Sequence, residues 1–108
     1  MNETKRIAIL GSTGSIGTQA LQVIASHPEH FEVEVLSALN NADLLIDQAR
    51  RFHPNAVVIC NEDHYPRVKD ALAKEPIKVF AGEKALCSVV QMETIDLVVA
   101  AQVGYSGL

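Results

Sequence analysis

Three glycines recur at every third position near the start of the chain, in the segment Gly11-Ser-Thr-Gly-Ser-Ile-Gly17. An apolar run at residues 6–10 precedes them and an amphipathic stretch to about residue 26 follows them. Glycines at a strand-to-helix turn let the backbone bend tightly and approach a phosphate closely, while N–H groups at the helix start hold the anion. Ser12, Thr13 and Ser15 add hydroxyl donors. The segment therefore predicts a site for the pyrophosphate of a dinucleotide.

The spacing of this segment is GxxGxxG, with one residue more before the middle glycine than in the usual dinucleotide fingerprint. The phosphate-binding loop of nucleoside triphosphatases is excluded because no Gly-Lys-Ser or Gly-Lys-Thr follows. Glycines can also serve a turn that binds nothing, and the residues alone leave that alternative open.

The segment that follows the second predicted strand, residues 31–36, bears on the choice of dinucleotide. In an NAD site, an Asp or Glu about 20 residues beyond the glycines accepts a hydrogen bond from the ribose 2′-hydroxyl. Residues 36–41, Leu-Ser-Ala-Leu-Asn-Asn, contain no acid. Glu32 and Glu34 lie earlier, where strand alternation turns both towards solvent. We therefore expect NADP rather than NAD.

Three polar side chains near the same strand end could donate to the 2′-phosphate of NADP, namely Ser37, Asn40 and Asn41. Asparagine is also a preferred residue before a helix, and a helix is expected from residue 42. Helix capping and phosphate binding are both compatible with the residue types.

Apolar runs and amphipathic stretches alternate at intervals of about 20–25 residues, which is the βαβ pattern. The runs predict strands at residues 6–10, 31–36, 56–60, 77–80 and 95–101, and helices to about 26, at 42–52, from 64 or 65 to 74, and at 82–91. The inner face of the first helix is expected to carry Ile16, Ala20, Val23 and Ile24. The fold class is α/β, a Rossmann-like doubly wound parallel sheet with the order βαβαβαβαβ. Residues 104–108 are expected in a βα loop, with the last helix and strand lying beyond residue 108.

Length and composition narrow the class of protein. The 108 residues fit one domain, and 48% apolar with 20% charged residues is typical of a globular chain. The net charge of −4, without a basic cluster, argues against nucleic acid as a partner. The longest apolar run, residues 97–101, is far short of the roughly 20 residues that span a bilayer. No signal-peptide core follows Met1, so a cytoplasmic location without a membrane partner is expected.

Other reactive side chains show no arrangement typical of catalysis or metal binding. Cys60 and Cys87 lack CxxC spacing and are expected to be reduced and buried. His27 and His30 are separated by Pro28, which suggests a solvated turn rather than a metal site. We therefore assign no catalytic and no metal-binding residue in this chain.

Several motifs together resemble the N-terminal part of the 1-deoxy-D-xylulose 5-phosphate reductoisomerase family. They are Ile9-Leu-Gly-Ser-Thr-Gly-Ser-Ile-Gly17, Pro28-Glu-His-Phe31, Asn41, Phe52, Pro54 and Ala100-Ala-Gln-Val-Gly-Tyr-Ser-Gly-Leu108. The resemblance spans the whole chain, and its glycine string is far more specific than a generic Gly-rich turn.

The resemblance implies an oxidoreductase of the non-mevalonate isoprenoid pathway. Such an enzyme rearranges 1-deoxy-D-xylulose 5-phosphate, a sugar phosphate, and reduces the resulting aldehyde with NADPH to 2-C-methyl-D-erythritol 4-phosphate. It uses a divalent metal, Mg or Mn, and forms a homodimer. The family's metal ligands, substrate-phosphate site and lid lie beyond Leu108. Residues 1–108 would therefore be an NADPH-binding domain, an N-terminal fragment that is inactive alone.

The same resemblance implies which residues contact the cofactor. From the Gly-rich turn they are Thr13, Gly14, Ser15 and Ile16, and from the end of the second strand Leu39, Asn40 and Asn41. Leu39 and Asn40 stand where the family often has Gly-Lys, so a neutral amide takes the place of an ammonium group.

Two other functions fit the Gly-rich turn. One is a different GxxGxxG reductase that acts on NADP and a semialdehyde or acyl phosphate, which requires a catalytic cysteine. Cys87 suits that role poorly because it is expected on a helix, away from the crevice beyond the strand ends. The other is a non-catalytic module that senses dinucleotides.

Overall fold

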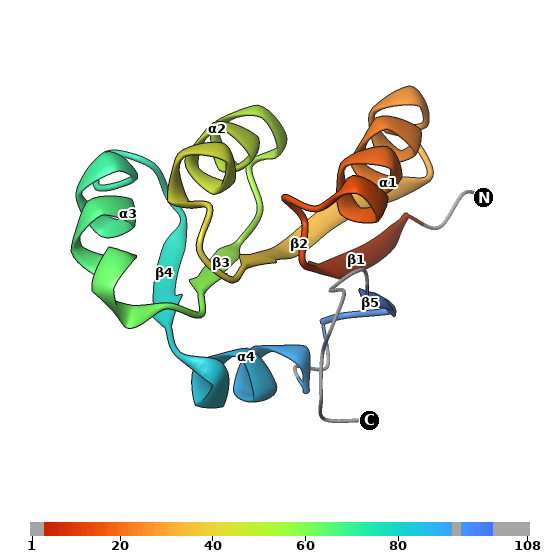
Figure 1. The fold of residues 1–108 in the computed structure, drawn as a ribbon. Coiled ribbons are helices and arrows are strands. Elements are labelled where there is room, and N and C mark those ends of the chain that lie inside the picture. Colours follow the sequence, from red (N-terminus) through yellow and green to blue (C-terminus); the bar gives the residue numbers. More distant parts are fainter. Residues whose placement is uncertain (1–3, 92–93, 101–108) are drawn as a thin grey trace.

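Five parallel strands form one sheet in the order β4-β3-β2-β1-β5 (Figure 1). The computed structural model describes residues 4–91 and 94–100. Along the chain the elements are β1 (Lys5–Leu10), α1 (Ser15–Ser26), β2 (Phe31–Ala38), α2 (Ala42–Phe52), β3 (Ala56–Ile59), the short 3-10 helix η1 (Glu62–His64), α3 (Tyr65–Ala71), β4 (Lys78–Ala81), α4 (Glu83–Val90) and β5 (Leu97–Ala100).

Helices cover both faces of this sheet. Figure 1 shows α1, α2 and α3 on one face and α4 on the other. The chain thus crosses the sheet from β1 to β4, then returns through α4 to place β5 beside β1. In such sheets, ligands bind beyond the carboxyl ends of the strands, where the direction of winding reverses. The predicted doubly wound α/β class is confirmed, while the predicted loop at 104–108 lies outside the described residues.

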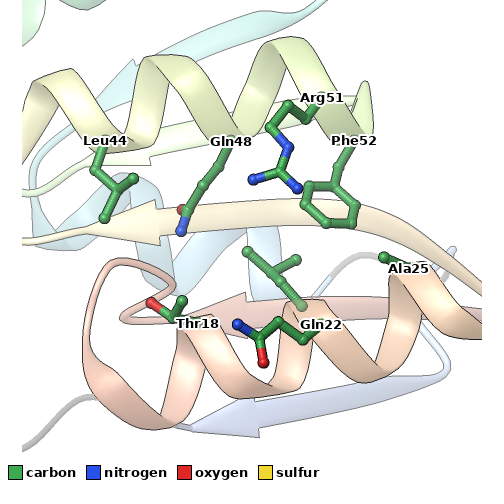
Figure 2. Close-up of a pocket in the computed structure, with 8 residues that line it drawn as sticks. Thr18, Gln22, Ala25, Leu44, Gln48, Arg51 and Phe52 are labelled. Carbon is green, nitrogen blue, oxygen red and sulfur yellow. The ribbon is translucent and has the colours of Figure 1, made fainter.

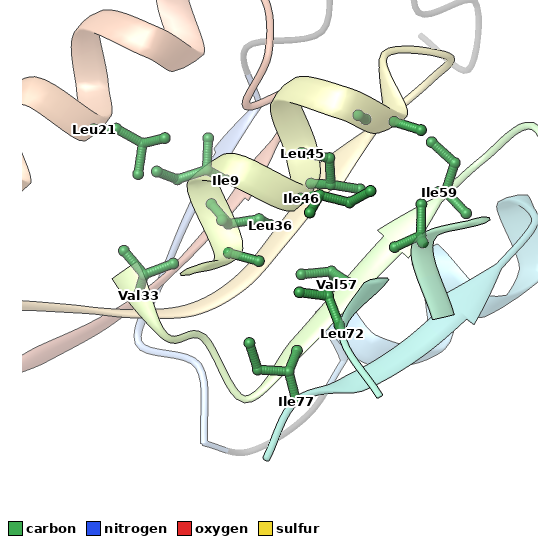
Figure 3. Packing of buried hydrophobic residues seen from close by; sticks show 14 of the residues in the cluster. Ile9, Leu21, Val33, Leu36, Leu45, Ile46, Val57, Ile59, Leu72 and Ile77 are labelled. Atoms are coloured by element: carbon green, nitrogen blue, oxygen red, sulfur yellow. The ribbon is translucent and has the colours of Figure 1, made fainter. Parts of the chain in front are cut away.

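The larger hydrophobic core lies between the sheet and helices α1 to α3 (Figure 3). Ile9, Leu36 and Ile59 from the strands meet Leu45 from α2 and Leu72, the residue directly after α3, all essentially inaccessible to solvent. Burial of each such side chain contributes about 1.5–3 kcal/mol. A smaller cluster packs against α4. The two clusters fix the strands, and with them the loops at the carboxyl edge of the sheet.

Helix α1 is rotated relative to the sequence prediction. Its buried residues are Gly17, Leu21 and Ile24, whereas Ile16 and Val23 are 55% and 54% exposed. The reason is Gly17, at which a Cβ atom would lie 2.3 Å from the carbonyl oxygen of Gly11. This close approach brings the Gly17 side of the helix onto the Gly-rich turn and leaves Ile16 in solvent.

The prediction that Glu34 faces solvent is wrong, although Glu32 is indeed exposed. Ile7 pairs with Val33 but the next residue pairs with Val35, so Glu34 is an extra residue in β2. Because helices cover both faces of a parallel sheet, neither side of a central strand leads to water. Glu34 is 2% exposed.

The carboxylate of Glu34 lies at the amino end of the sheet. It accepts hydrogen bonds from Asn55 Nδ2, at 2.7 Å, and Thr94 Oγ1, at 3.2 Å. Asn55 directly precedes β3, and Thr94 comes shortly before β5. Glu34 therefore lies away from the edge where the Gly-rich turn is found.

The cysteine prediction is partly corrected. Both thiols are free, as expected, but Cys60 is only half-buried and Cys87 is exposed on α4. Helix α4 carries its apolar residues Leu86 and Val89 towards the sheet, and Cys87 follows Leu86 on the outer side. None of the helices in the described part of the chain is both long and apolar enough to cross a membrane.

The close approach at Gly17 predicts that Gly17→Ala destabilises the protein. Alanine favours a helix over glycine by about 1 kcal/mol, so propensity alone predicts a gain. The added methyl would instead collide with backbone, and we expect a net loss of about 1–3 kcal/mol in the free energy of unfolding. Urea denaturation measures it. The control is Gly14→Ala, at an exposed residue with φ −79°; equal stability of the two variants would contradict the packing argument.

Candidate functional site

The Gly-rich turn lies at the carboxyl end of β1 and leads directly into α1. Gly11 adopts φ 81°, a left-handed conformation that L side chains disfavour. Gly14 is the residue before the helix and is exposed. Two of the three glycines thus have steric reasons within the fold, Gly11 for its backbone angle and Gly17 for its packing. Gly14 has no such reason and is exposed where a ligand could approach.

The start of α1 is open to an anion. Its first helical hydrogen bond runs from the Thr18 N–H to the Gly14 carbonyl, at 2.9 Å. The N–H groups of Ser15, Ile16 and Gly17 come before this bond and have no acceptor within the helix. No side chain caps this end and its first turn contains no acid. By contrast, α2 has both a side-chain cap and an acidic residue in its first turn. The partial positive charge at the start of α1 is therefore available to a phosphate group.

Buried hydrogen bonds hold the Gly-rich turn against β2 and α2. The N–H groups of Gly11 and Ser12 both donate to the Ser37 carbonyl, at 3.1 and 2.8 Å. The Ser12 hydroxyl donates to Gln48 Oε1 at 2.7 Å, and Gln48 Nε2 donates back to the Ser12 carbonyl at 2.9 Å. Figure 2 shows Gln48 extending from α2 towards the neighbouring elements. Ser12, Ser37 and Gln48 are all buried, so their hydrogen bonds fix the position of the turn.

These contacts correct two sequence predictions and add a residue. Ser12 and Ser37 were predicted as donors to a ligand, but both are fully buried and Ser37 Oγ accepts from the Gly11 N–H at 3.1 Å. They shape the turn instead. Gln48 was missed; the available signal was its position between Leu45 and Phe52, on the buried side of α2. A polar residue on an apolar helix face needs a buried partner.

The end of β2 lies beside this turn, because the Ser37 carbonyl accepts hydrogen bonds from the N–H groups of Gly11 and Ser12. Leu39 is 50% exposed, and Asn40 and Asn41 are exposed. Asn41 caps α2, its side-chain oxygen accepting from the Leu44 N–H at 3.2 Å. The capping interpretation is therefore confirmed for Asn41. Asn40 does not cap; its side-chain oxygen accepts from Asn61 Nδ2 at 2.8 Å.

The structure thus brings the seven predicted cofactor residues to one edge of the sheet. They are Thr13, Gly14, Ser15, Ile16, Leu39, Asn40 and Asn41, all exposed except Thr13, which is half-buried. The nearest acid along the chain after β2 is Asp43, which forms an ion pair with Arg67. The arrangement suits a ligand with a phosphate at the helix start and a second polar group near Asn40.

Two other regions do not form part of this edge. A groove between α1 and α2 is lined by residues such as Gln22, Arg51 and Phe52 and includes none of the seven (Figure 2). His27 and His30 lie in the exposed turn between α1 and β2. Within residues 4–91 and 94–100, no three His, Cys, Asp or Glu side chains gather as a metal site.

The Cys60 thiol shows no sign of activation as a nucleophile. Burial raises the pKa of the Cys60 thiol, and the nearby negative charge of Glu83 raises it further. Cys60 is therefore a neutral thiol at physiological pH, whereas a nucleophilic cysteine needs a lowered pKa. Cys87 lies on α4, on the face of the sheet opposite α1.

The buried hydrogen bonds predict that Gln48→Ala weakens both the fold and ligand binding. The change removes the side-chain donor to the buried Ser12 carbonyl and leaves the Ser12 hydroxyl only its longer hydrogen bond to the Ser37 carbonyl, at 3.2 Å. Loss of the buried partner costs about 1–3 kcal/mol of unfolding free energy. The turn then moves more freely, and we expect weaker binding of the dinucleotide. Denaturation and a fluorescence titration of the full-length protein measure the two effects. The control is Gln22→Ala, an exposed residue of the same groove; a Gln48 variant that behaves like this control would contradict the role of the network.

Comparison with known proteins agrees with this arrangement. Residues 7–108 match the model of the 1-deoxy-D-xylulose 5-phosphate reductoisomerase family. The chain is 61% identical over 110 residues to the 1-deoxy-D-xylulose 5-phosphate reductoisomerase of Bacteroides fragilis. That match covers 100% of this chain but only 28% of the relative.

Solved structures give the same result. A crystal structure of DOX-P reductoisomerase in complex with magnesium superposes with a TM-score of 0.91 at 32% identity, covering 98% of this chain and 27% of that one. The Zymomonas mobilis enzyme in complex with NADPH gives a TM-score of 0.80 at 32% identity, over 83% of this chain and 24% of that one. The shared motifs, the shared fold and the sequence identity lead to one conclusion: the chain belongs to the 1-deoxy-D-xylulose 5-phosphate reductoisomerase family.

Proposed function

We propose that residues 1–108 are the NADPH-binding domain of an enzyme that converts 1-deoxy-D-xylulose 5-phosphate to 2-C-methyl-D-erythritol 4-phosphate. The observation that carries the proposal is the uncapped start of α1 behind the GxxGxxG turn, in a member of this family. Its three leading N–H groups offer donors to a pyrophosphate. The similarity to an enzyme solved with NADPH supports this choice of ligand.

Each predicted cofactor residue then has a physical task. Thr13, Gly14, Ser15 and Ile16 would surround the pyrophosphate, through backbone N–H groups and the Thr13 and Ser15 hydroxyls. Leu39, Asn40 and Asn41 would contact the adenosine end, with Leu39 offering apolar surface and Asn40 a hydrogen-bond donor. When bound, NADPH supplies the hydride that reduces the aldehyde formed by the rearrangement.

The preference for NADPH over NADH follows from the charge at the end of β2. A carboxylate there would accept from the 2′-hydroxyl of NADH and repel the 2′-phosphate of NADPH. Residues 36–42 contain no acid, and Glu34 is held at the amino end of the sheet by Asn55 and Thr94. Neutral amides remain, and their N–H groups can donate to a phosphate.

The remaining parts of the function concern the whole protein. The chain spans 28% of the length of its curated relative, so substrate and metal are assigned by family membership. We propose that magnesium or manganese binds the sugar-phosphate substrate on residues outside this chain. We further propose a cytoplasmic homodimer with no nucleic-acid or membrane partner.

An assay of the full-length protein tests the proposed function directly. Oxidation of NADPH, followed by its absorbance, should require both 1-deoxy-D-xylulose 5-phosphate and a divalent metal. NADPH oxidation driven instead by a semialdehyde or acyl phosphate would favour a different reductase. Tight NADPH binding with no turnover of the sugar phosphate would favour a sensing module.

The position of Gly14 predicts that Gly14→Val strongly weakens dinucleotide binding without unfolding the protein. Its φ of −79° and ψ of 176° are accessible to valine, and the residue is exposed, so the fold should persist. The branched side chain would occupy the space of the pyrophosphate. Calorimetric titration should show binding at least about tenfold weaker, a loss of about 1.4 kcal/mol or more. The affinity of Gly14→Ala, which adds a smaller side chain, should lie between those of the wild-type protein and Gly14→Val. Wild-type affinity in Gly14→Val would contradict the assignment.

A further inference from the structure

Asn61 lies beside Asn40 because the ends of two parallel strands meet at one edge. Asn40 follows β2 and Asn61 follows β3. Strand pairing extends beyond both strands, with the Asn61 N–H donating to the Leu39 carbonyl at 2.9 Å. The two side chains are joined by a hydrogen bond of 2.8 Å from Asn61 Nδ2 to Asn40 Oδ1. Asn61 was not among the residues that the sequence indicated for cofactor binding.

The direction of this hydrogen bond is set by a neighbouring backbone group. The side chain of Asn61 caps η1, its Oδ1 accepting from the Asp63 N–H at 3.0 Å. A backbone N–H can only donate, so the oxygen of Asn61 must face Asp63 and its NH₂ group must face Asn40. An NH₂ group can only donate in turn, so Asn40 must present its oxygen to Asn61.

The free end of the Asn40 amide is therefore its NH₂ group. Within residues 4–91 and 94–100, no protein group accepts a hydrogen bond from Asn40 Nδ2. A phosphate oxygen can only accept hydrogen bonds, so an Asn40 amide whose NH₂ group is held free suits a phosphate. An amide free to rotate could equally present its oxygen, which would face the phosphate unfavourably.

We propose that Asn61 is a positioning residue for cofactor selectivity: it holds the Asn40 amide with NH₂ directed at the 2′-phosphate of NADPH. This inference rests on the proposed NADPH function. The Asn40 amide is oriented by a chain of hydrogen bonds that begins at the Asp63 N–H. Asn61 acts through Asn40 and needs no contact of its own with the cofactor.

The test is Asn61→Asp in the full-length protein. Aspartate caps a helix as well as asparagine does, so the cap on η1 and the stability should persist. Its second oxygen can only accept, so the Asn40 amide must turn its NH₂ group towards residue 61 and its oxygen outwards. The donor to the 2′-phosphate is then lost. We expect the ratio of NADH to NADPH dissociation constants to fall at least about tenfold, as for loss of a hydrogen bond to a charged group.

A carboxylate at residue 61 could also weaken NADPH binding by repelling the 2′-phosphate. It would add a third negative charge directly before Glu62 and Asp63. Asn61→Asp is therefore also made in an Asn40→Ala background. If Asn61 acts through Asn40, the second substitution changes the ratio by less than about twofold there. An equal effect in both backgrounds would show repulsion and overturn the proposal.

The wild-type titrations separate this proposal from the one it rests on. Wild-type protein that binds neither dinucleotide would overturn the NADPH function and the role of Asn61 together. Wild-type protein that prefers NADPH, with an unchanged preference in Asn61→Asp, would overturn the role of Asn61 alone. Thermal unfolding of each variant checks that the compared proteins are folded.

Discussion

The reciprocal hydrogen bonds between Ser12 and Gln48 are the interaction on which the rest of the site depends. A Gly-rich turn has many accessible conformations, and ordering it costs about 1–2 kcal/mol per residue at the moment of binding unless the fold has already done so. Here Gln48 from α2 and the Ser37 carbonyl from β2 hold the turn from two sides. The hydrogen bonds of the protein itself therefore hold the start of α1 in place.

This constraint links the turn to the end of β2. Ser37 anchors the turn, and the chain directly after β2 exposes Leu39 and Asn40. The pyrophosphate and adenosine portions of the proposed site are thus positioned by one segment of backbone. The strand order places both at the carboxyl edge of the sheet, close to the strand β1 at which the direction of winding reverses. A rigid edge of this kind favours affinity because little ordering remains for binding to accomplish.

Most of the fold could be predicted from the sequence because apolar runs and helix signals agreed along the chain. The Gly-rich turn, the capping role of Asn41 and the absence of an acid after β2 were all visible as local patterns. Glu34 could not be placed, because an extra residue in β2 depends on pairing with β1. Ile16 was misplaced because the rotation of α1 is decided by the contact between Gly17 and Gly11.

The same limit applies to the polar residues of the site. Ser12 and Ser37 have the residue types of ligand donors, and only burial shows that they are structural. Gln48 and Asn61 matter through partners 36 and 21 residues away in the chain. Such long-range hydrogen bonds leave no local pattern in the sequence. The orientation of the Asn61 and Asn40 amides becomes clear only once the Asp63 N–H is seen to donate to Asn61.

The central claim is that the Gly-rich turn and the end of β2 form a dinucleotide site whose shape exists before binding. A crystal structure of the full-length protein with NADPH, beside one without it, tests this most directly. We expect the pyrophosphate at the N–H groups of Ser15 and Ile16, the 2′-phosphate at Asn40, and the Ser12–Gln48 hydrogen bonds intact in both structures. NADPH bound elsewhere, or a turn that forms these hydrogen bonds only with NADPH present, would contradict the account.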